Sequence, residues 1–550
     1  MLLRFLSNHV TKAVYLLLFA FLLATPLATE AGPLKSGLSY DHSTISQEPP
    51  YGYNVFLPPV TRTDTWNHNS FSHNLFLPMV IKSTVWNSNP FGFESESSLT
   101  NGSLAQKVDD LNPGWARLNR RISWRDLQPV EGGPIQWSLL ADFETELRLL
   151  SSQYVKPIII IDDYPRWATI AENSCSPLRE NKFAAFASFA QALVARYSNS
   201  TFNVYDWELG NEVDVDQRLV PLDSQFGCWG NIDDKQYYGG DYYGKMVKVV
   251  GAAIKGQNPA ARVWLGGLMV ATPVTTDPNL GKPENFIRGI LAVGAAPYFD
   301  VVSYHGHVSW YGSRKDGFYN TESVWYPYGG GNIGKARFLK GILQEYGVNK
   351  TLFLSEAGVG CPESVALCEN PPESFFEYQA DEGIRLIVPV VNEPDIEGFI
   401  WYQLPGPGWR SSGLLTGNYQ PKPIYTAYQE LVEATWGSTV GGKINYGDGL
   451  EAYEFRKGNT LIHIVWTKTD VTLPISIPTN QFIRAVDRDG NAITPQIIGD
   501  FAVLRPTFSP IYVFRHPGFQ SVSAVWPNAQ EVGAQEVALF RKDFFSQTQP

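Results

Sequence analysis

Apolar and polar positions alternate in two ways between residues 89 and 436. Short apolar runs recur along this region, and the run at 155–161, with its four consecutive isoleucines, is typical of a strand buried on both faces. Other segments carry apolar residues at helical spacing, as at 183–197, which predicts a helix with one face against a sheet. Strands are predicted at 91–94, 115–118, 155–161, 202–207, 262–266, 300–304, 351–355 and 398–402. Helices are predicted at 183–197, 242–254, 334–346, 375–391 and 424–432.

This order of elements predicts an α/β fold. Eight strands with helices between them favour a (β/α)₈ TIM barrel over residues 89–436. A doubly wound open sheet is the alternative, but no glycine-rich phosphate loop follows the first strand. We therefore expect a barrel, with its functional side chains at the carboxyl ends of the strands.

After residue 436 the pattern changes to short β-rich runs separated by turns. Strands are predicted at 453–456, 460–466, 471–475, 482–487, 501–504 and 511–514. They predict a small C-terminal β-sandwich at 437–516, which either supports the barrel or binds sugar, and we favour the supporting role. Residues 517–550 form a tail to which the pattern assigns no structure.

The first 88 residues differ from the rest of the chain. Residues 1–30 combine basic residues, an apolar stretch and a run of small residues, which predicts a cleaved signal peptide. A retained membrane anchor is the alternative, but the apolar stretch is shorter than the ~20 residues that a span needs. Residues 31–88 are rich in Pro, Ser, Thr and Asn and repeat a short motif, FLPPV at 56–60 and FLPMV at 76–80. This segment is predicted to be a linker or, alternatively, a surface-attachment motif.

The composition of the chain limits the classes of molecule that it is expected to bind. The formal net charge of −11 disfavours binding to nucleic acid or to an anionic membrane. Sixteen Trp and 27 Tyr fit either a large core or a cleft whose rings stack on sugars, and composition alone does not decide between them. We expect a secreted or surface-attached protein without a membrane segment after signal cleavage.

The four cysteines fit export, because disulfides persist in oxidising compartments. Four cysteines allow three pairings. Cys361 and Cys368 lie close together in one segment, so we pair them, which leaves Cys175 with Cys228. Their spacing and the absence of neighbouring histidines do not resemble a zinc site, so no metal or other cofactor is expected.

Polar side chains collect at the predicted carboxyl ends of the strands. They are Arg117, Asn119, Arg120, Asp162, Asp163, Asn211, Glu212, His305, His307 and Glu356, together with the aromatic Trp401. In a barrel these residues meet at one mouth, and packing does not account for them. A functional site is therefore predicted there.

Two of these residues suit the cleavage of glycosidic bonds. Glu212 follows one predicted strand beside Asn211, and Glu356 ends another. A carboxylic acid can protonate a glycosidic oxygen, and an amide can bind a sugar hydroxyl. Carboxyl groups held ~5–5.5 Å apart allow direct attack on the anomeric carbon, which retains its configuration. Since their proximity opposes double ionisation, we expect Glu212 to be protonated while Glu356 is charged.

Six short motifs resemble those of glycoside hydrolase clan A, the retaining (β/α)₈ enzymes with one catalytic Glu after the fourth strand and another after the seventh. The motifs are WELGNE at 207–212, LSE at 354–356, WAR at 115–117, SYH at 303–305, FIW at 399–401 and KPIY at 422–425. Together with YPRWA at 164–168 and the segment 123–129, they are most similar to family 39 and its relatives.

The resemblance implies a role for each matched residue. Glu212 is the expected general acid/base, Glu356 the nucleophile, and Asn211 the partner of the sugar 2-hydroxyl. Arg117 is expected to lie beside Glu356 and keep it ionised.

The remaining expectations concern the walls of the site. Trp401 is expected to floor the subsite of the reacting sugar and His305 to line it, with Asp163 and Trp167 as further substrate contacts. Many clan members place a Tyr two residues after the sixth-strand His, but here that residue is His307. Either His307 bonds the nucleophile, or Tyr304 or Tyr311 does so.

Three functions therefore remain open from the sequence. A secreted retaining glycosidase that acts on a β-linked polysaccharide or oligosaccharide is favoured, because both carboxylic acids are present. A carbohydrate-binding or adhesion protein on an inactive barrel is one alternative. A transglycosylase that uses the same residues is the other.

Overall fold

A computed structural model describes residues 89–518, apart from 172, 174, 232–235, 278–279 and 313–322. The predicted signal peptide, the segment 31–88 and all but the first two residues of the tail lie outside the described residues.

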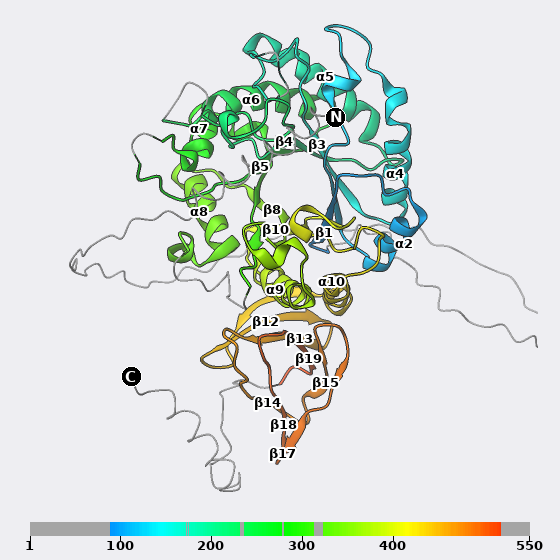
Figure 1. The fold of residues 1–550 in the computed structure, drawn as a ribbon, viewed down its shortest axis with the longest axis vertical. Coiled ribbons are helices and arrows are strands. Elements are labelled where there is room, and N and C mark those ends of the chain that lie inside the picture. Colours follow the sequence, from blue (N-terminus) through cyan, green and yellow to red (C-terminus); the bar gives the residue numbers. More distant parts are fainter. Residues whose placement is uncertain are drawn as a thin grey trace, which may run out of the picture. The chain divides into compact units, whose positions relative to one another are not determined.

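Eight parallel strands close into a barrel in the order β1, β10, β8, β6, β5, β4, β3, β2 (Figure 1). These strands are β1 (Phe91–Ser95), β2 (Trp115–Leu118), β3 (Lys156–Ile161), β4 (Asp206–Asn211), β5 (Arg262–Leu268), β6 (Val301–His305), β8 (Thr351–Ala357) and β10 (Ile396–Trp401). The first and last strands pair with each other, so the ring has no open edge. The predicted (β/α)₈ barrel is confirmed.

Helices surround the ring of strands (Figure 1). They are α2 (Gly102–Leu111), α3 (Trp124–Leu127), α4 (Ala141–Ser152), α5 (Phe183–Tyr197), α6 (Gly240–Gln257), α7 (Phe286–Ala292), α8 (Gly331–Glu345), α9 (Glu373–Val391) and α10 (Pro423–Thr435). All five predicted helices are present, and α5 has the predicted bounds. The predictions did not include α2, α3, α4 and α7.

The interior of the barrel has an apolar lower layer and a charged upper layer. The lower layer is a buried cluster that the strands supply, and its members are Trp115, Ile158, Trp264, Val301, Phe353 and Ile400. Arg117 lies two residues after Trp115 in β2, and Ser303 lies two residues after Val301 in β6. Because alternate residues of a strand face the same side, these polar side chains also point into the barrel, nearer to its mouth.

The fourth strand begins later than the sequence pattern predicts. Residues 202–207 were the predicted strand, whereas β4 spans Asp206–Asn211. Asn203 has a left-handed φ of 58°, which a strand cannot contain, so the residues before Asp206 lead into the strand. The shift makes Asn211 the last residue of β4 and Glu212 the first residue after it.

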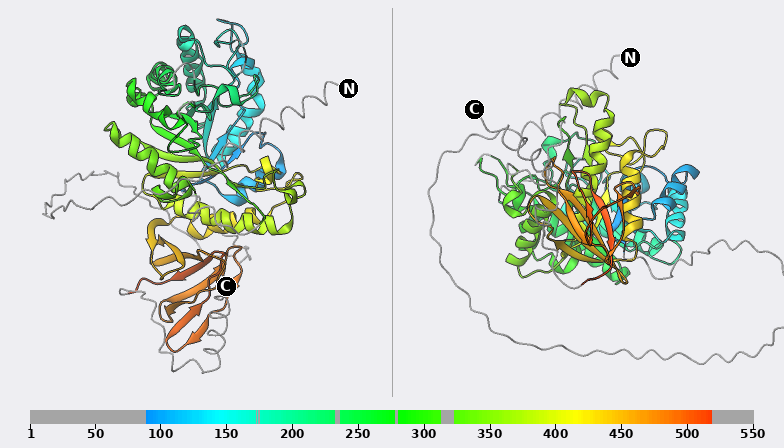
Figure 2. Two further views of the ribbon diagram at one scale, coloured as in Figure 1. Left: turned by 60° about the vertical axis from the view of Figure 1, so that its left-hand side comes forward. Right: turned by 90° about the horizontal axis from the view of Figure 1, so that it is seen from below.

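Two antiparallel sheets follow the barrel and form the predicted β-sandwich (Figure 2). The larger sheet contains β11 (Thr439–Ile444), β12 (Leu450–Lys457), β13 (Thr460–Thr467), β19 (Ile511–Arg515), β15 (Phe482–Asp487) and β16 (Ala492–Ile493). The smaller contains β14 (Ile475–Pro478), β18 (Phe501–Leu504) and β17 (Gln496–Ile498). The strand predicted at 471–475 was wrong, because Val471 is exposed in a turn and pairing begins at Ile475.

Buried arginines join α9 to the sandwich. Arg385 of α9 donates from Nη1 to the carbonyl oxygens of Thr467, at 2.8 Å, and Phe508, at 3.0 Å. Its guanidinium also lies 3.8 Å from the centre of the Phe508 ring. Arg488 of the sandwich forms an ion pair of 2.5 Å with Asp381 of α9.

Both predicted disulfides are present. Cys175 bonds Cys228 and thereby joins the loops after β3 and β4, while Cys361 bonds Cys368 within the loop after β8. Among the described helices, none has the length and apolar character needed to cross a membrane.

Candidate active site

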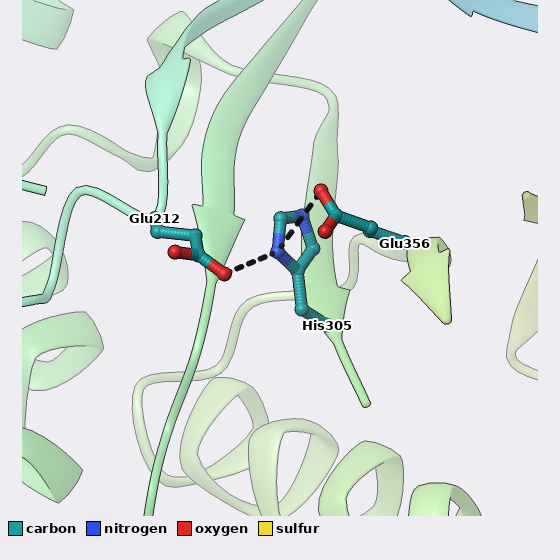
Figure 3. A group of neighbouring side chains, drawn as sticks. All are labelled: Glu212, His305 and Glu356. Atoms are coloured by element: carbon teal, nitrogen blue, oxygen red, sulfur yellow. Dashed lines mark hydrogen bonds and ion pairs between the residues drawn. The ribbon is translucent and has the colours of Figure 1, made fainter. Parts of the chain in front are cut away.

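Glu212 and Glu356 face each other across the mouth of the barrel, with His305 between them (Figure 3). Glu212 follows β4, Glu356 lies near the end of β8, and His305 ends β6. His305 Nδ1 is 3.2 Å from Glu212 Oε1 and 3.6 Å from Glu356 Oε2. One oxygen of each carboxyl group and the histidine nitrogen all lie within 4.8 Å of one another. The sequence-predicted pair is therefore brought together at the predicted face.

The backbone at the end of β4 directs Glu212 across the mouth. Gly210 and Glu212 both have positive φ angles, of 92° and 50°, with Asn211 between them. A residue other than glycine seldom adopts this conformation, and it costs of order 1 kcal/mol. Asn211 Oδ1 accepts a hydrogen bond of 2.7 Å from Arg117, so the amide presents its Nδ2 donor at the opposite end.

His305 is fixed by close contact with the backbone of β5. A Cβ atom on Gly267 would lie 2.0 Å from Nε2 of His305, so only glycine fits at this position. Burial lowers the pKa of His305 to about 3, which makes its ring neutral near pH 7. Among the described residues, Nε2 has no hydrogen-bond partner.

Arg117 binds three carboxylates and one amide from beneath the mouth. Its guanidinium donates to Glu208 at 2.7 Å, to Glu94 at 2.6 Å and to Glu356 at 3.0 Å. Arg117 and Glu208 are fully buried, and Glu208 also accepts from the backbone of Gly267 and the hydroxyl of Ser303. Since Arg117 is buried, it positions Glu356 and Asn211 and does not touch substrate.

The two facing carboxyl groups differ in acidity. Burial, followed by the charge of Glu356, raises the pKa of Glu212 to about 7. Burial also opposes ionisation of Glu356, but His305, the hydrogen bond from His307 and the charge of Arg117 together lower its pKa well below the usual range. Because His305 is neutral near pH 7, the cation that keeps Glu356 ionised there is Arg117.

Of His307, Tyr304 and Tyr311, which were the alternatives for bonding Glu356, His307 is the one that contacts it. Its Nε2 lies 3.1 Å from Glu356 Oε1, and its ring packs edge-on against Tyr402 and Trp409. The prediction for Tyr304 was wrong: this residue is fully buried, and its hydroxyl donates to the carbonyl of Asn332 in α8. Tyr311 is 50% exposed, and the contacts of Glu356 are with other residues.

Trp401 does not floor the site, which corrects the sequence-based expectation. Its side chain is 0% exposed. Its indole donates to the carbonyl of Ser412, lies beside Tyr428 of α10 and contacts Gly383 of α9. The residue therefore packs between β10 and the surrounding helices. The next residue, Tyr402, points to the mouth instead.

Asp163 and Trp167 lie in the loop after β3. Asp163 accepts hydrogen bonds from Ser123 and Gln225, and it lines a small pocket that also includes Asn211. Trp167 packs edge-on against Trp124, 5.1 Å away, and donates to a loop carbonyl. Contact of either residue with substrate stays a prediction.

Sequence reasoning missed Glu94, Tyr402 and Trp409. Glu94 accepts from Arg117 and from Asn119, and burial with the charge of Glu356 raises its pKa well above the usual value. A charged residue within the apolar strand β1 was a usable signal, since buried charges need partners. For Tyr402 and Trp409 the signal was weaker, because both lie in or beside a loop.

The side chains of Glu212, His305 and Glu356 could also surround a cation. Two features of the site oppose this use. The pKa of Glu212 is raised to about 7, and Glu356 already forms an ion pair with the guanidinium of Arg117. The arrangement therefore suits proton transfer and nucleophilic attack better than metal binding.

Comparisons with solved structures find the same fold in several glycoside hydrolases. A family 39 glycoside hydrolase from Bacteroides cellulosilyticus WH2 aligns with a TM-score of 0.58 at 17% identity, over 78% of this chain and 80% of that chain. A GH30 endoxylanase from Clostridium papyrosolvens C71 gives 0.52 at 13% identity, over 78% and 97%. The GH39 enzyme from Xanthomonas axonopodis pv. citri gives 0.51 at 13% identity, over 79% and 94%.

The resemblance to clan A that the sequence motifs suggested is thus confirmed at the level of the fold. No protein-family profile and no curated protein sequence matches the chain.

Proposed function

We propose that the protein is a retaining glycoside hydrolase that cleaves β-linked oligo- or polysaccharides by double displacement. One observation carries the proposal: the carboxyl groups of Glu212 and Glu356 have oxygens within 4.8 Å of each other, and their surroundings raise the pKa of the first and lower that of the second. This separation leaves no room for a water molecule between an acid and a base, as inversion requires, and suits direct attack.

In the first step, Glu212 is the acid and Glu356 the nucleophile. Glu212 donates its proton to the glycosidic oxygen as the bond from that oxygen to the anomeric carbon breaks. Glu356 forms a bond to the same carbon from the opposite face, which gives a covalent glycosyl-enzyme. Asn211 offers its Nδ2 donor to the 2-hydroxyl, where contacts strengthen in the transition state.

In the second step, Glu212 acts as the base. Once Glu356 is esterified its charge is gone, and that charge contributes to the raised pKa of Glu212. The pKa of Glu212 therefore falls, and its carboxylate can accept a proton from water. The resulting hydroxide displaces Glu356 and restores the original configuration of the sugar.

The proposal is tested with aryl β-glycosides of xylose, glucose, mannose and arabinose. We expect hydrolysis of at least one, and NMR should show the β-anomer as the first product. Glu356→Ala should lower kcat by about 10⁴-fold or more. In Glu356→Gly, added azide should replace the nucleophile and give the α-glycosyl azide, whereas Glu212→Gly should give the β-azide.

Other outcomes separate the alternatives. An α-anomer as the first product would rule out double displacement. Binding of sugars without any hydrolysis would identify a carbohydrate-binding barrel, and transfer products in place of free sugar would identify a transglycosylase. We also propose export, which the two disulfides support because they need an oxidising compartment.

A further inference from the structure

Three side chains stand at the mouth beside the catalytic pair, at the ends of adjacent strands. Glu96 follows β1, Arg120 comes two residues after β2, and Tyr402 follows β10. In the closed ring, β1 lies between β10 and β2. The three side chains therefore arise side by side. The opposite arc of the ring, β4 to β6, carries Glu212 and His305.

These side chains form a continuous row that starts at the nucleophile. His307 bonds Glu356 and packs edge-on against the ring of Tyr402, with ring centres 5.7 Å apart. The hydroxyl of Tyr402 donates to Glu96 Oε1 at 3.2 Å. Glu96 Oε2 lies 3.6 Å from Nη1 of Arg120. The row thus ends in a pair of opposite charges.

The pair is open to a ligand. Glu96 is held at the mouth by the hydroxyl of Tyr402, whose ring packs against His307. The side chain of Glu96 is 21% exposed and that of Arg120 is 47% exposed. Their separation of 3.6 Å is longer than a hydrogen bond, so each still has capacity to bond a ligand.

The chemistry of the reaction places the glycone near this row. The leaving group must lie at Glu212, because that residue protonates its oxygen. The sugar that becomes attached to Glu356 extends away from the leaving group, toward the arc of β10, β1 and β2. Hydroxyls of this sugar would thus lie beside Glu96 and Arg120.

We infer that Glu96 and Arg120 form the subsite that selects an uncharged glycone by two neighbouring hydroxyl groups, an inference that rests on the proposed function. Glu96 can accept a hydrogen bond from one hydroxyl while Arg120 donates to the other. Their charges sum to zero. A uronic acid would bring its carboxylate close to both Glu96 and Glu356, and the repulsion would disfavour it.

The test compares each substitution with the loss of one hydroxyl. Glu96→Gln and Arg120→Met are assayed on the best aryl glycoside of the panel and on its 3-deoxy, 4-deoxy and 6-deoxy analogues. For each variant we expect kcat/KM on the parent sugar to fall about 10- to 100-fold. One deoxy analogue already lacks the hydroxyl that the substituted residue contacts. On that analogue the substitution should lower kcat/KM by less than about 3-fold. Equal losses on every sugar, or no loss, would overturn the inference.

A binding experiment separates this inference from the proposed function. The Glu212→Gln protein is titrated with the methyl β-glycosides of glucose, xylose, mannose and arabinose and their deoxy analogues, with and without the Glu96 substitution. If the wild type cleaves no glycoside but Glu96→Gln weakens binding only of sugars with one particular hydroxyl, the proposed function fails and the subsite stands. If the wild type is active and binding shows no such dependence, or no sugar binds, the subsite fails.

Glu345→Gln is the matched control. It removes the carboxylate of another partly exposed ion pair, with Arg288, on α8 in the outer helical layer. We expect unchanged kinetics on every sugar of the panel.

Discussion

At the scale of single residues, the protonation of Glu212 gives the most direct test of the proposed mechanism. Because the pKa of this group is raised to about 7, kcat/KM on substrates with poor leaving groups should fall as the pH rises through about 7. A pH–rate profile measures this limb. Glu212→Gln should abolish the limb together with most of the activity on such substrates.

The same group makes stability depend on pH. A raised pKa in the folded state contributes stability that is present below the unfolded value, near 4.5, and is lost as the pH rises through about 7. Urea unfolding at several pH values should show a shallower decline for Glu212→Gln across this window. A decline equal to that of the wild type would mean that Glu212 is not the titrating group.

Loss of Arg117 should lower the free energy of unfolding and raise the pKa of Glu356. Arg117→Met leaves Glu94, Glu208 and Glu356 buried without their shared cation, which should cost about 3–5 kcal/mol in urea unfolding. Arg117→Lys keeps the charge and should fold better. In Arg117→Met the acid limb of kcat/KM should move to higher pH, because Glu356 loses its neighbouring cation and becomes easier to protonate.

The control for Arg117 is Arg337→Met. Arg337 pairs with Glu393 at the surface, with about half of its side chain exposed, so its loss should cost less than about 1 kcal/mol. An acid limb that stays in place in Arg117→Met would contradict the assigned role.

Strand alternation explains which site residues the sequence could identify. His305 and Ser303 share the inner face of β6, so Tyr304 between them had to point outward to the helices. Ile400 lies inside the barrel, so Trp401 points outward and Tyr402 returns to the inner side. The residue types were recognisable in the sequence. The expectations for Tyr304 and Trp401 were wrong because they did not take into account that alternate residues of a strand face opposite sides.

At the scale of elements, predictability followed the fraction of apolar residues. The strand β3 and the helix α5 were found because their apolar patterns are nearly continuous. The strand β4 was misplaced because it buries Asp206, Glu208 and Asn211. The partners that satisfy these polar groups come from distant strands, and no local pattern contains them.

The two disulfides should differ in their contribution to stability. Cys175–Cys228 closes a loop with a sequence separation of 53, and Cys361–Cys368 one of 7. Loop-closure entropy predicts losses of roughly 4 kcal/mol and roughly 2 kcal/mol for the paired Ser substitutions. Urea unfolding under oxidising conditions measures both. The reverse order would show that contacts in the folded loops, and not chain entropy, dominate.

At the scale of the whole molecule, the barrel and the sandwich should unfold together. Arg385 donates to two carbonyls of the sandwich from within the barrel helix α9 and is itself almost fully buried. We expect one calorimetric transition for the wild type, and Arg385→Ala should lower the stability and divide the transition into two.

Arg456→Ala is the control for this interface, because Arg456 pairs with Glu454 within the sandwich and is largely exposed. It should leave the single transition intact. Two transitions in the wild type would show that the buried arginine does not couple the two parts.

The fixed ring of His305 has a consequence for the whole catalytic cycle. Its Nε2 lies against Gly267 without an acceptor among the described residues, so the neutral ring carries its hydrogen on Nδ1, between the two carboxyl groups. In the proposed double displacement, negative charge begins on Glu356 and resides on Glu212 after esterification. An N–H on Nδ1 would lie 3.6 Å from Glu356 Oε2 and 3.2 Å from Glu212 Oε1, so in this proposal the histidine stabilises the charge at both stages without turning.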